Sequence, residues 1–107
     1  ITFDNNDFAD GTSVIAADGS VLVINTPDGS TLSGSGGNDQ IYGGLGNSSD
    51  GNESISAGAG NDIVQGNNGA DSIAGGTGND TLYGGQGGDV LNGDNGADFL
   101  QGNAGAD

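Results

Sequence analysis

Aliphatic side chains recur at every ninth position over most of the chain, separated by glycine and mainly polar residues. In Ser72-Ile73-Ala74, for example, one large apolar residue stands between two small ones. This alternation predicts a short strand whose middle side chain points to one side and whose neighbours point to the other. A single such residue in nine cannot bury itself, so the pattern predicts stacked strands that share a narrow core. The aliphatic positions are Ile41, Ile55, Val64, Ile73, Leu82, Leu91 and Leu100.

The same period governs two further positions when the chain is divided into nonapeptides from Gly34. The sixth position is always acidic, and its residues are Asp39, Glu53, Asp62, Asp71, Asp80, Asp89, Asp98 and Asp107. The fourth position is always glycine, and its residues are Gly37, Gly46, Gly60, Gly69, Gly78, Gly87, Gly96 and Gly105. In this division, residues 43–56 form one repeat with a five-residue insertion, Ser48 to Asn52. An internal repeat this regular determines the fold.

Residues close to the pattern Gly-Gly-x-Gly-x-Asp precede the three-residue strands and predict a turn, although Ala57 and several Asn or Ser residues replace glycine at the first two positions. Glycine adopts positive φ at no steric cost, so it suits such a turn. The turn also directs backbone carbonyl groups towards a common centre.

The complete pattern resembles the nonapeptide of the repeats-in-toxin (RTX) family, a calcium-binding β-helix repeat. The resemblance covers residues 34–107 and implies an all-β fold, a right-handed parallel β-roll with two nonapeptides in each coil. It implies that calcium lies between successive loops on one edge, held by the sixth-position carboxylates and by loop carbonyls. Glu53, which replaces aspartate, departs from the pattern. The carbonyl candidates are those of Gly60, Gly69, Gly78, Gly87 and Gly96.

Loops then alternate between two edges of the roll. One edge carries Asp39, Asp62, Asp80 and Asp98, and the other carries Glu53, Asp71, Asp89 and Asp107. Four loops leave three gaps on each edge, so two edges offer places for up to about six calcium ions. Because Asp80 and Asp89 have a same-edge loop on both sides, we expect each of them to serve two ions.

The charge balance excludes several functions. The chain has 15 acidic residues and no lysine, arginine or histidine, which gives a formal net charge of −15. Binding to nucleic acid or to an anionic membrane surface needs basic side chains, so both are excluded. Without histidine or cysteine there is no ordinary zinc site and no thiol nucleophile. No apolar run approaches the length of a membrane-spanning helix. Because so acidic a chain with few large apolar residues stays unfolded by itself, a hard cation is its natural counter-charge.

Two alternative interpretations do not involve a metal site. In the first, the acidic residues form a solvated acidic surface, and in the second, the glycine-rich stretch is a flexible linker. Acidic residues on a solvated surface need not recur every nine residues at a fixed distance from a glycine. A flexible linker does not require an aliphatic residue at every ninth position. The repeat therefore favours a folded, metal-binding roll.

Residues 1–33 lack the repeat and are interpreted as a separate β head that caps the roll or adds metal-free coils. Asp18-Gly19 predicts a two-residue hairpin turn, and Pro27-Asp28-Gly29 predicts a second turn.

Near the start of the chain, the acid-rich segment 4–11 does not fit the EF-hand spacing, because Phe8 falls at a ligand position. A solvated loop is favoured there over an extra calcium site. Because the chain starts at Ile1, we expect it to be a piece of a longer protein.

The resemblance implies a structural calcium-binding module of a secreted or cell-surface protein, exported unfolded and folded outside, where calcium is millimolar. A self-associating segment of a filament, adhesin or surface layer is the alternative, through head-to-tail or lateral contacts. In enzymes of this family the repeats follow a separate catalytic domain, and none is visible here, so we expect no catalysis. Ice binding is disfavoured because the third loop position carries a single threonine, Thr77.

The seventh and ninth residues of each strand are expected to face outward. On one sheet these are large or aromatic, and on the other they are mostly small. Stacked in one face, the large set predicts a contact surface for the head, another domain or a neighbouring molecule. Its members are Gln40, Tyr42, Ile63, Gln65, Thr81, Tyr83, Phe99 and Gln101.

Overall fold

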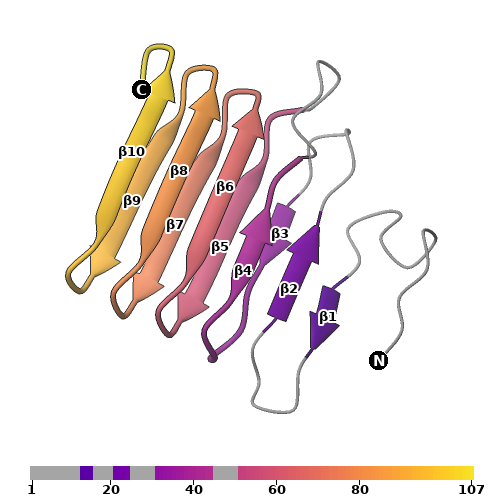
Figure 1. The fold of residues 1–107 in the computed structure, drawn as a ribbon, viewed down its shortest axis with the longest axis vertical. Helices are drawn as coiled ribbons and strands as arrows, with labels where there is room; N and C mark the ends of the chain where they lie inside the picture. The colour runs from indigo at the N-terminus through magenta and orange to yellow at the C-terminus, as the bar shows by residue number, and fades with distance from the viewer. Residues whose placement is uncertain (1–12, 16–20, 25–30, 45–50) are drawn as a thin grey trace.

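The computed structural model describes residues 13–15, 21–24, 31–44 and 51–107, which form two facing sheets (Figure 1). The six-stranded sheet has the order β1-β2-β4-β6-β8-β10. Its strands are β1 (Ser13–Ile15), β2 (Val21–Ile24), β4 (Gln40–Tyr42), β6 (Ile63–Asn68), β8 (Thr81–Gln86) and β10 (Phe99–Ala104). The four-stranded sheet has the order β3-β5-β7-β9. Its strands are β3 (Thr31–Ser33), β5 (Ser54–Ala59), β7 (Ser72–Thr77) and β9 (Val90–Asn95).

From β2 to β10, neighbouring strands within each sheet are parallel, and the chain passes from one sheet to the other and back in each coil. Ile73 lies opposite Leu91, and Leu82 lies opposite Leu100, each pair 18 residues apart. Two nonapeptides therefore make one coil, which confirms the predicted all-β parallel roll. The part of the chain that the structure describes contains no helix, and hence none long and apolar enough to span a membrane.

Strands β5 to β10 are six residues long, which is twice the predicted length. They include the first three residues of the following nonapeptide, which sequence reasoning assigned to the turn. Along β7, Ile73 and Gly75 are both buried and their neighbours are more exposed, so the inward alternation continues past the aliphatic residue. The glycines at these positions pair with the next coil, as Gly58 does with Gly76, and the turn proper shrinks to positions four to six.

The core is the double column of eighth-position aliphatics that fills the space between the sheets. Burial of such side chains contributes about 1.5–3 kcal/mol each. The column begins at Leu32, and its buried members are Leu32, Ile41, Ile55, Val64, Ile73 and Leu82, with Ala57 beside them. Leu91 is partly buried against this cluster, and Leu100 is 43 % exposed.

The described strands of the head join the roll. β2 pairs with β4 and β3 pairs with β5, both parallel, while β1 pairs with β2 antiparallel. The antiparallel pairing of β1 with β2, in which Ile15 lies opposite Val21, is the pairing expected of a hairpin. The turn predicted at Asp18-Gly19 lies outside the described residues.

The position of the insertion also differs from the prediction. The carbonyl of Gly51 lies against Gly69 in the next coil, as that of Gly60 lies against Gly78. Gly51, rather than Gly46, therefore occupies the fourth position of its loop. Since the side chain of Asn67 at position two donates to the carbonyl of Gly44 at position two, the additional residues fall within 45–50. That segment, the turn predicted at 27–29 and the acidic segment 4–11 lie outside the described residues.

Candidate metal centre

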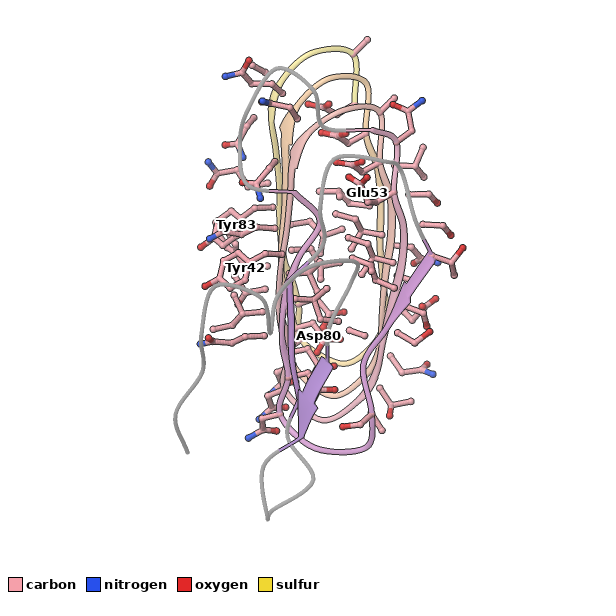
Figure 2. All side chains as sticks on the ribbon, turned by 90° about the vertical axis from the view of Figure 1, so that its right-hand side faces the viewer. Tyr42, Glu53, Asp80 and Tyr83 are labelled. Carbon is pink, nitrogen blue, oxygen red and sulfur yellow. The ribbon has the colours of Figure 1, made fainter. Side chains whose placement is uncertain are left out.

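The sixth-position acids form two columns, one at each edge of the roll. Each acid stands immediately before a strand: Asp62 before β6 and Asp80 before β8 on one edge, Asp71 before β7 and Asp89 before β9 on the other. The columns are Asp39, Asp62, Asp80 and Asp98, and Glu53, Asp71, Asp89 and Asp107, with steps of 18 residues except the 23 from Asp39 to Asp62 across the insertion. Figure 2 shows Glu53 and Asp80 directed into the space between the sheets.

Each column is joined from coil to coil by its own carboxylates. The backbone N–H of Asp62 donates to Oδ1 of Asp80 at 2.9 Å, and that of Asp71 donates to Oδ1 of Asp89 at 2.9 Å. The same bond runs from Asp39 to Asp62 at 2.8 Å. Each of these carboxylates therefore reaches back to the preceding coil and uses one oxygen there.

The second carboxylate oxygen is not satisfied in the central loops. Asp62, Asp80 and Asp89 are at most 2 % exposed, and their Oδ2 atoms have no hydrogen-bond partner among the described residues. A buried charge without a partner is strongly unfavourable. The chain has no basic side chain to compensate it. A bound cation would supply the missing partner, so these residues fit a metal ion.

Burial also raises the pKa of Asp62, the largest cause being desolvation of the carboxylate. The negative charges of Asp39 and Asp80 raise this pKa further, whereas the backbone hydrogen bond from Asp39 lowers it. The site therefore disfavours the charge of this carboxylate, and a cation beside it would offset the effect.

Carbonyl oxygens lie close to these carboxylates at the first position of each loop. A Cβ placed on Gly43 would lie 2.6 Å from the carbonyl oxygen of Gly66 and 3.2 Å from Oε2 of Glu53. A Cβ on Gly75 would likewise meet Oδ2 of Asp80 and the carbonyl of Gly93. A side chain at either glycine would therefore collide with a carboxylate oxygen and a carbonyl oxygen that lie close together, and oxygen donors of these two kinds are the ligands that calcium prefers. Sequence reasoning missed these first-position carbonyls, because it placed glycine there only for its turn geometry.

The predicted fourth-position carbonyls also lie between coils. Those of Gly60, Gly69 and Gly78 lie against the glycine one coil further on, and that of Gly87 lies against Gly105. Within the described residues, no three acidic side chains gather at one point. An ion between coils would therefore take most of its ligands from backbone carbonyls.

The ends of the acidic columns differ from their centres. Asp39 is buried, but its carboxylate accepts hydrogen bonds from the amide of Ser35, at 2.5 Å, and from the Ser35 hydroxyl, at 3.0 Å. Asp98 is partly buried, and Asp107 is exposed. The central loops therefore offer the more enclosed positions.

A second ladder, at position five, was not predicted. Oδ1 of Asn38 accepts from the amide of Asn61 at 2.8 Å, and Oδ1 of Asn61 accepts from that of Asn79 at 2.8 Å. Asn79 continues the ladder to Ala97. On the other edge, Asn52 supplies one such bond, to Ala70. The recurrence of asparagine before the sixth-position acid was the available signal.

Comparison with known proteins is consistent with these sites. The family model described as RTX calcium-binding nonapeptide repeat (4 copies) matches residues 28–49, 47–82 and 83–107. These matches together run from residue 28 to the last residue. No curated protein and no solved structure matches the chain.

Proposed function

The chain belongs to the RTX calcium-binding repeat family, and on that premise we propose that it is a secreted structural module that folds when it binds calcium. The unpartnered, buried Oδ2 atoms of Asp62, Asp80 and Asp89 carry this proposal, since they require a cation that the chain itself does not contain. RTX repeats are calcium-binding structural units, and we propose no catalysis by this chain.

The proposed side-chain ligands are the sixth-position acids Asp39, Glu53, Asp62, Asp71, Asp80, Asp89, Asp98 and Asp107. The proposed backbone ligands are the carbonyls of Gly60, Gly69, Gly78, Gly87 and Gly96. To these we add the first-position carbonyls of Gly66, Gly84 and Gly93, because they lie near a carboxylate oxygen or a first-position glycine in the preceding coil.

Charge explains why calcium and folding are coupled. The three gaps on each of two edges offer places for up to six ions, and six ions would add a charge of about +12 against −15 and leave about −3. Without metal, carboxylates one strand spacing apart, about 5 Å, repel one another. Since the unfolded chain has no preformed site, the binding free energy becomes folding free energy. Such a module stays unfolded where calcium is scarce and folds outside the cell, which supports the extracellular location.

Circular dichroism of the chain during a calcium titration tests this function. We expect an unfolded spectrum in excess chelator, a cooperative change to a sheet spectrum with calcium, and much weaker folding with the same concentration of magnesium. Magnesium is the matched control because it demands near-ideal octahedral geometry and loses its water reluctantly. A sheet spectrum that survives complete chelation would refute the coupling.

Exposed apolar side chains favour self-association as a second candidate function. Val90 is 64 % exposed on β9, and Ile63 is 39 % exposed on β6, so each sheet presents apolar area to solvent. Lateral contact between rolls would cover it. Sedimentation velocity in calcium tests this: concentration-dependent oligomers support it, and a monomer at all concentrations contradicts it.

A further inference from the structure

The outer face of the six-stranded sheet contains a slot that the calcium sites do not use. It lies over β8, between β6 and β10, and has a volume of about 240 Å³. Figure 2 shows Tyr83 and Tyr42 projecting from this outer face, away from Glu53 and Asp80. The slot is lined by Gln65, Asn67, Tyr83, Gly84, Gly85 and Asn103.

Strand register creates the slot. Gly85 pairs with Asn67 of β6 on one side and with Asn103 of β10 on the other. The glycine therefore forms a floor without a side chain, and the two asparagines, two strand spacings or about 9.5 Å apart, form the walls. Both asparagines have positive φ, 77° and 74°, which distinguishes them from ordinary strand residues.

The walls are held in place before any ligand arrives. Nδ2 of Asn67 donates to the carbonyl of Gly44 at 2.6 Å, and Oδ1 of Asn103 accepts from Nε2 of Gln101. At the end of the slot, the Tyr83 ring packs against Phe99, with ring centroids 6.0 Å apart. A preformed slot of this kind loses little conformational entropy on binding.

The slot is uncharged in a chain of net charge −15. Its groups are amides, which donate and accept hydrogen bonds, and an aromatic ring, whose face is apolar. The net charge stays negative even with six calcium ions bound, so it repels anionic ligands, and the slot has no carboxylate to attract a cation. A ring-shaped ligand with hydroxyl groups on its rim and C–H groups on its faces satisfies both kinds of surface.

We propose that this slot binds a hexose unit of a neutral polysaccharide, whose chain lies across the strands. The inference goes beyond the calcium-binding function but rests on it, because the face exists only in the folded roll. Tyr42, Gln65, Tyr83 and Gln101 form one column across four successive strands. This column places the two tyrosines two strand spacings apart, about 9.5 Å, which suits alternate units of a linear glycan.

The test is an NMR titration of the calcium-saturated chain with cellohexaose, in which backbone amide shifts are followed. We expect saturable shifts at Gly84, Gly85, Asn67 and Asn103, and no shifts at Ser72 on the opposite sheet. Both tyrosines of the chain lie on this face, so tyrosine fluorescence should change with the same affinity. β-1,4-linked hexaglucuronate, the anionic counterpart, should bind at least about tenfold more weakly.

Two substitutions locate the ligand. Tyr83→Thr should weaken cellohexaose binding roughly tenfold, because it removes the stacking surface but keeps a strand-forming residue. Ser56→Thr, at the same repeat position on the four-stranded sheet, should change nothing. Circular dichroism in calcium, recorded before sugar is added, separates a failure to fold from a failure to bind. If Tyr83→Thr does not fold, Gln65→Thr should reduce the affinity instead.

Four results would overturn the proposal. Three are the absence of shifts at the slot amides up to millimolar cellohexaose, equal binding by Tyr83→Thr and the parent chain, and equal binding of β-1,4-linked hexaglucuronate. Shifts of the same amides with protein concentration alone would assign the face to a second copy of the chain and would equally contradict a sugar site.

Discussion

The backbone amide of Asn79 donates a hydrogen bond to Oδ1 of Asn61 at 2.8 Å, one coil back along the roll. The amide of the next residue, Asp80, donates in the opposite direction, to Oδ1 of Asp98 at 2.9 Å. Adjacent residues thus tie this loop to the coils on both sides. The asparagine bonds involve no carboxylate, so they stabilise the coil stack whether or not the acids hold a metal.

Asn61→Ala should therefore destabilise the calcium-bound roll by about 0.5–1.5 kcal/mol, since the Asn79 amide loses its acceptor. Denaturant unfolding at saturating calcium measures this change. Asn95→Ala, an exposed asparagine at position three, is the control and should change the free energy of unfolding by no more than about 0.5 kcal/mol. Equal effects of the two substitutions would show that the ladder contributes nothing.

The opposite substitution should stabilise the other edge, where only Asn52 supplies a bond of this type. Ala70→Asn places an amide one coil before Gly88 and adds a second bond to that ladder. We expect the free energy of unfolding to rise by up to about 1 kcal/mol, again at saturating calcium. An unchanged or lower value would contradict this geometry.

The fourth-position glycines should not tolerate a side chain. Gly78 has φ of 126°, and a Cβ there would collide with the carbonyl of Gly60. Gly78→Ala should therefore cost more than about 2 kcal/mol, from the left-handed backbone and the collision together. Gly36 is exposed, and a Cβ there would meet nothing within 4 Å, so Gly36→Ala is the matched control. Thermal unfolding in calcium compares them, and similar midpoints would contradict the close stacking of the coils.

Acid should stabilise the metal-free roll and weaken the calcium-bound one. Burial raises the pKa of Asp62 above its ordinary value of 3.8, so the folded chain binds more protons than the unfolded chain between these two pKa values. The stability that Asp62 contributes is fully present below the unfolded pKa and is lost as pH rises through the folded pKa. Calcium, in contrast, requires the ionised carboxylate.

Circular dichroism in chelator between pH 7 and pH 4 measures the stability of the metal-free roll. Calcium affinity over the same pH range measures how far protonation weakens calcium binding. We expect more sheet structure at the lower pH in chelator, together with weaker calcium binding. Asp62→Asn should reduce the pH dependence in chelator. The account fails if the metal-free chain becomes less folded as the pH falls towards 4.

The nine-residue period was sufficient to predict the stacking of the coils. Each nonapeptide contains one aliphatic and one acidic residue. Only one register between coils buries all the aliphatic residues and also aligns the acidic ones, and Ile73 lies opposite Leu91 in that register. Short sequence motifs were less informative where two identical motifs could fill the same position of the repeat. Gly46-Asn47 and Gly51-Asn52 are identical dipeptides, and contacts with the next coil select the second: the Gly51 carbonyl lies against Gly69, and the Ala70 amide donates to Asn52.

The length of the strands depends on contacts between coils, which the secondary-structure propensities of single residues do not reflect. Gly75 and Gly76 have turn-forming composition, yet they belong to β7 because the neighbouring coils supply their partners.

Calorimetric calcium binding by Asp80→Asn and Asp94→Asn tests the central claim most directly. Both substitutions remove one negative charge. Asn at position 80 keeps the Oδ1 acceptor for the Asp62 amide but loses the unpartnered Oδ2, whereas exposed Asp94 has φ of 66°, which asparagine tolerates. The account predicts that Asp94→Asn binds as many calcium ions as the parent chain, and that Asp80→Asn binds fewer ions with less cooperativity. Equal stoichiometry and cooperativity for the two variants would contradict calcium binding by the acidic columns.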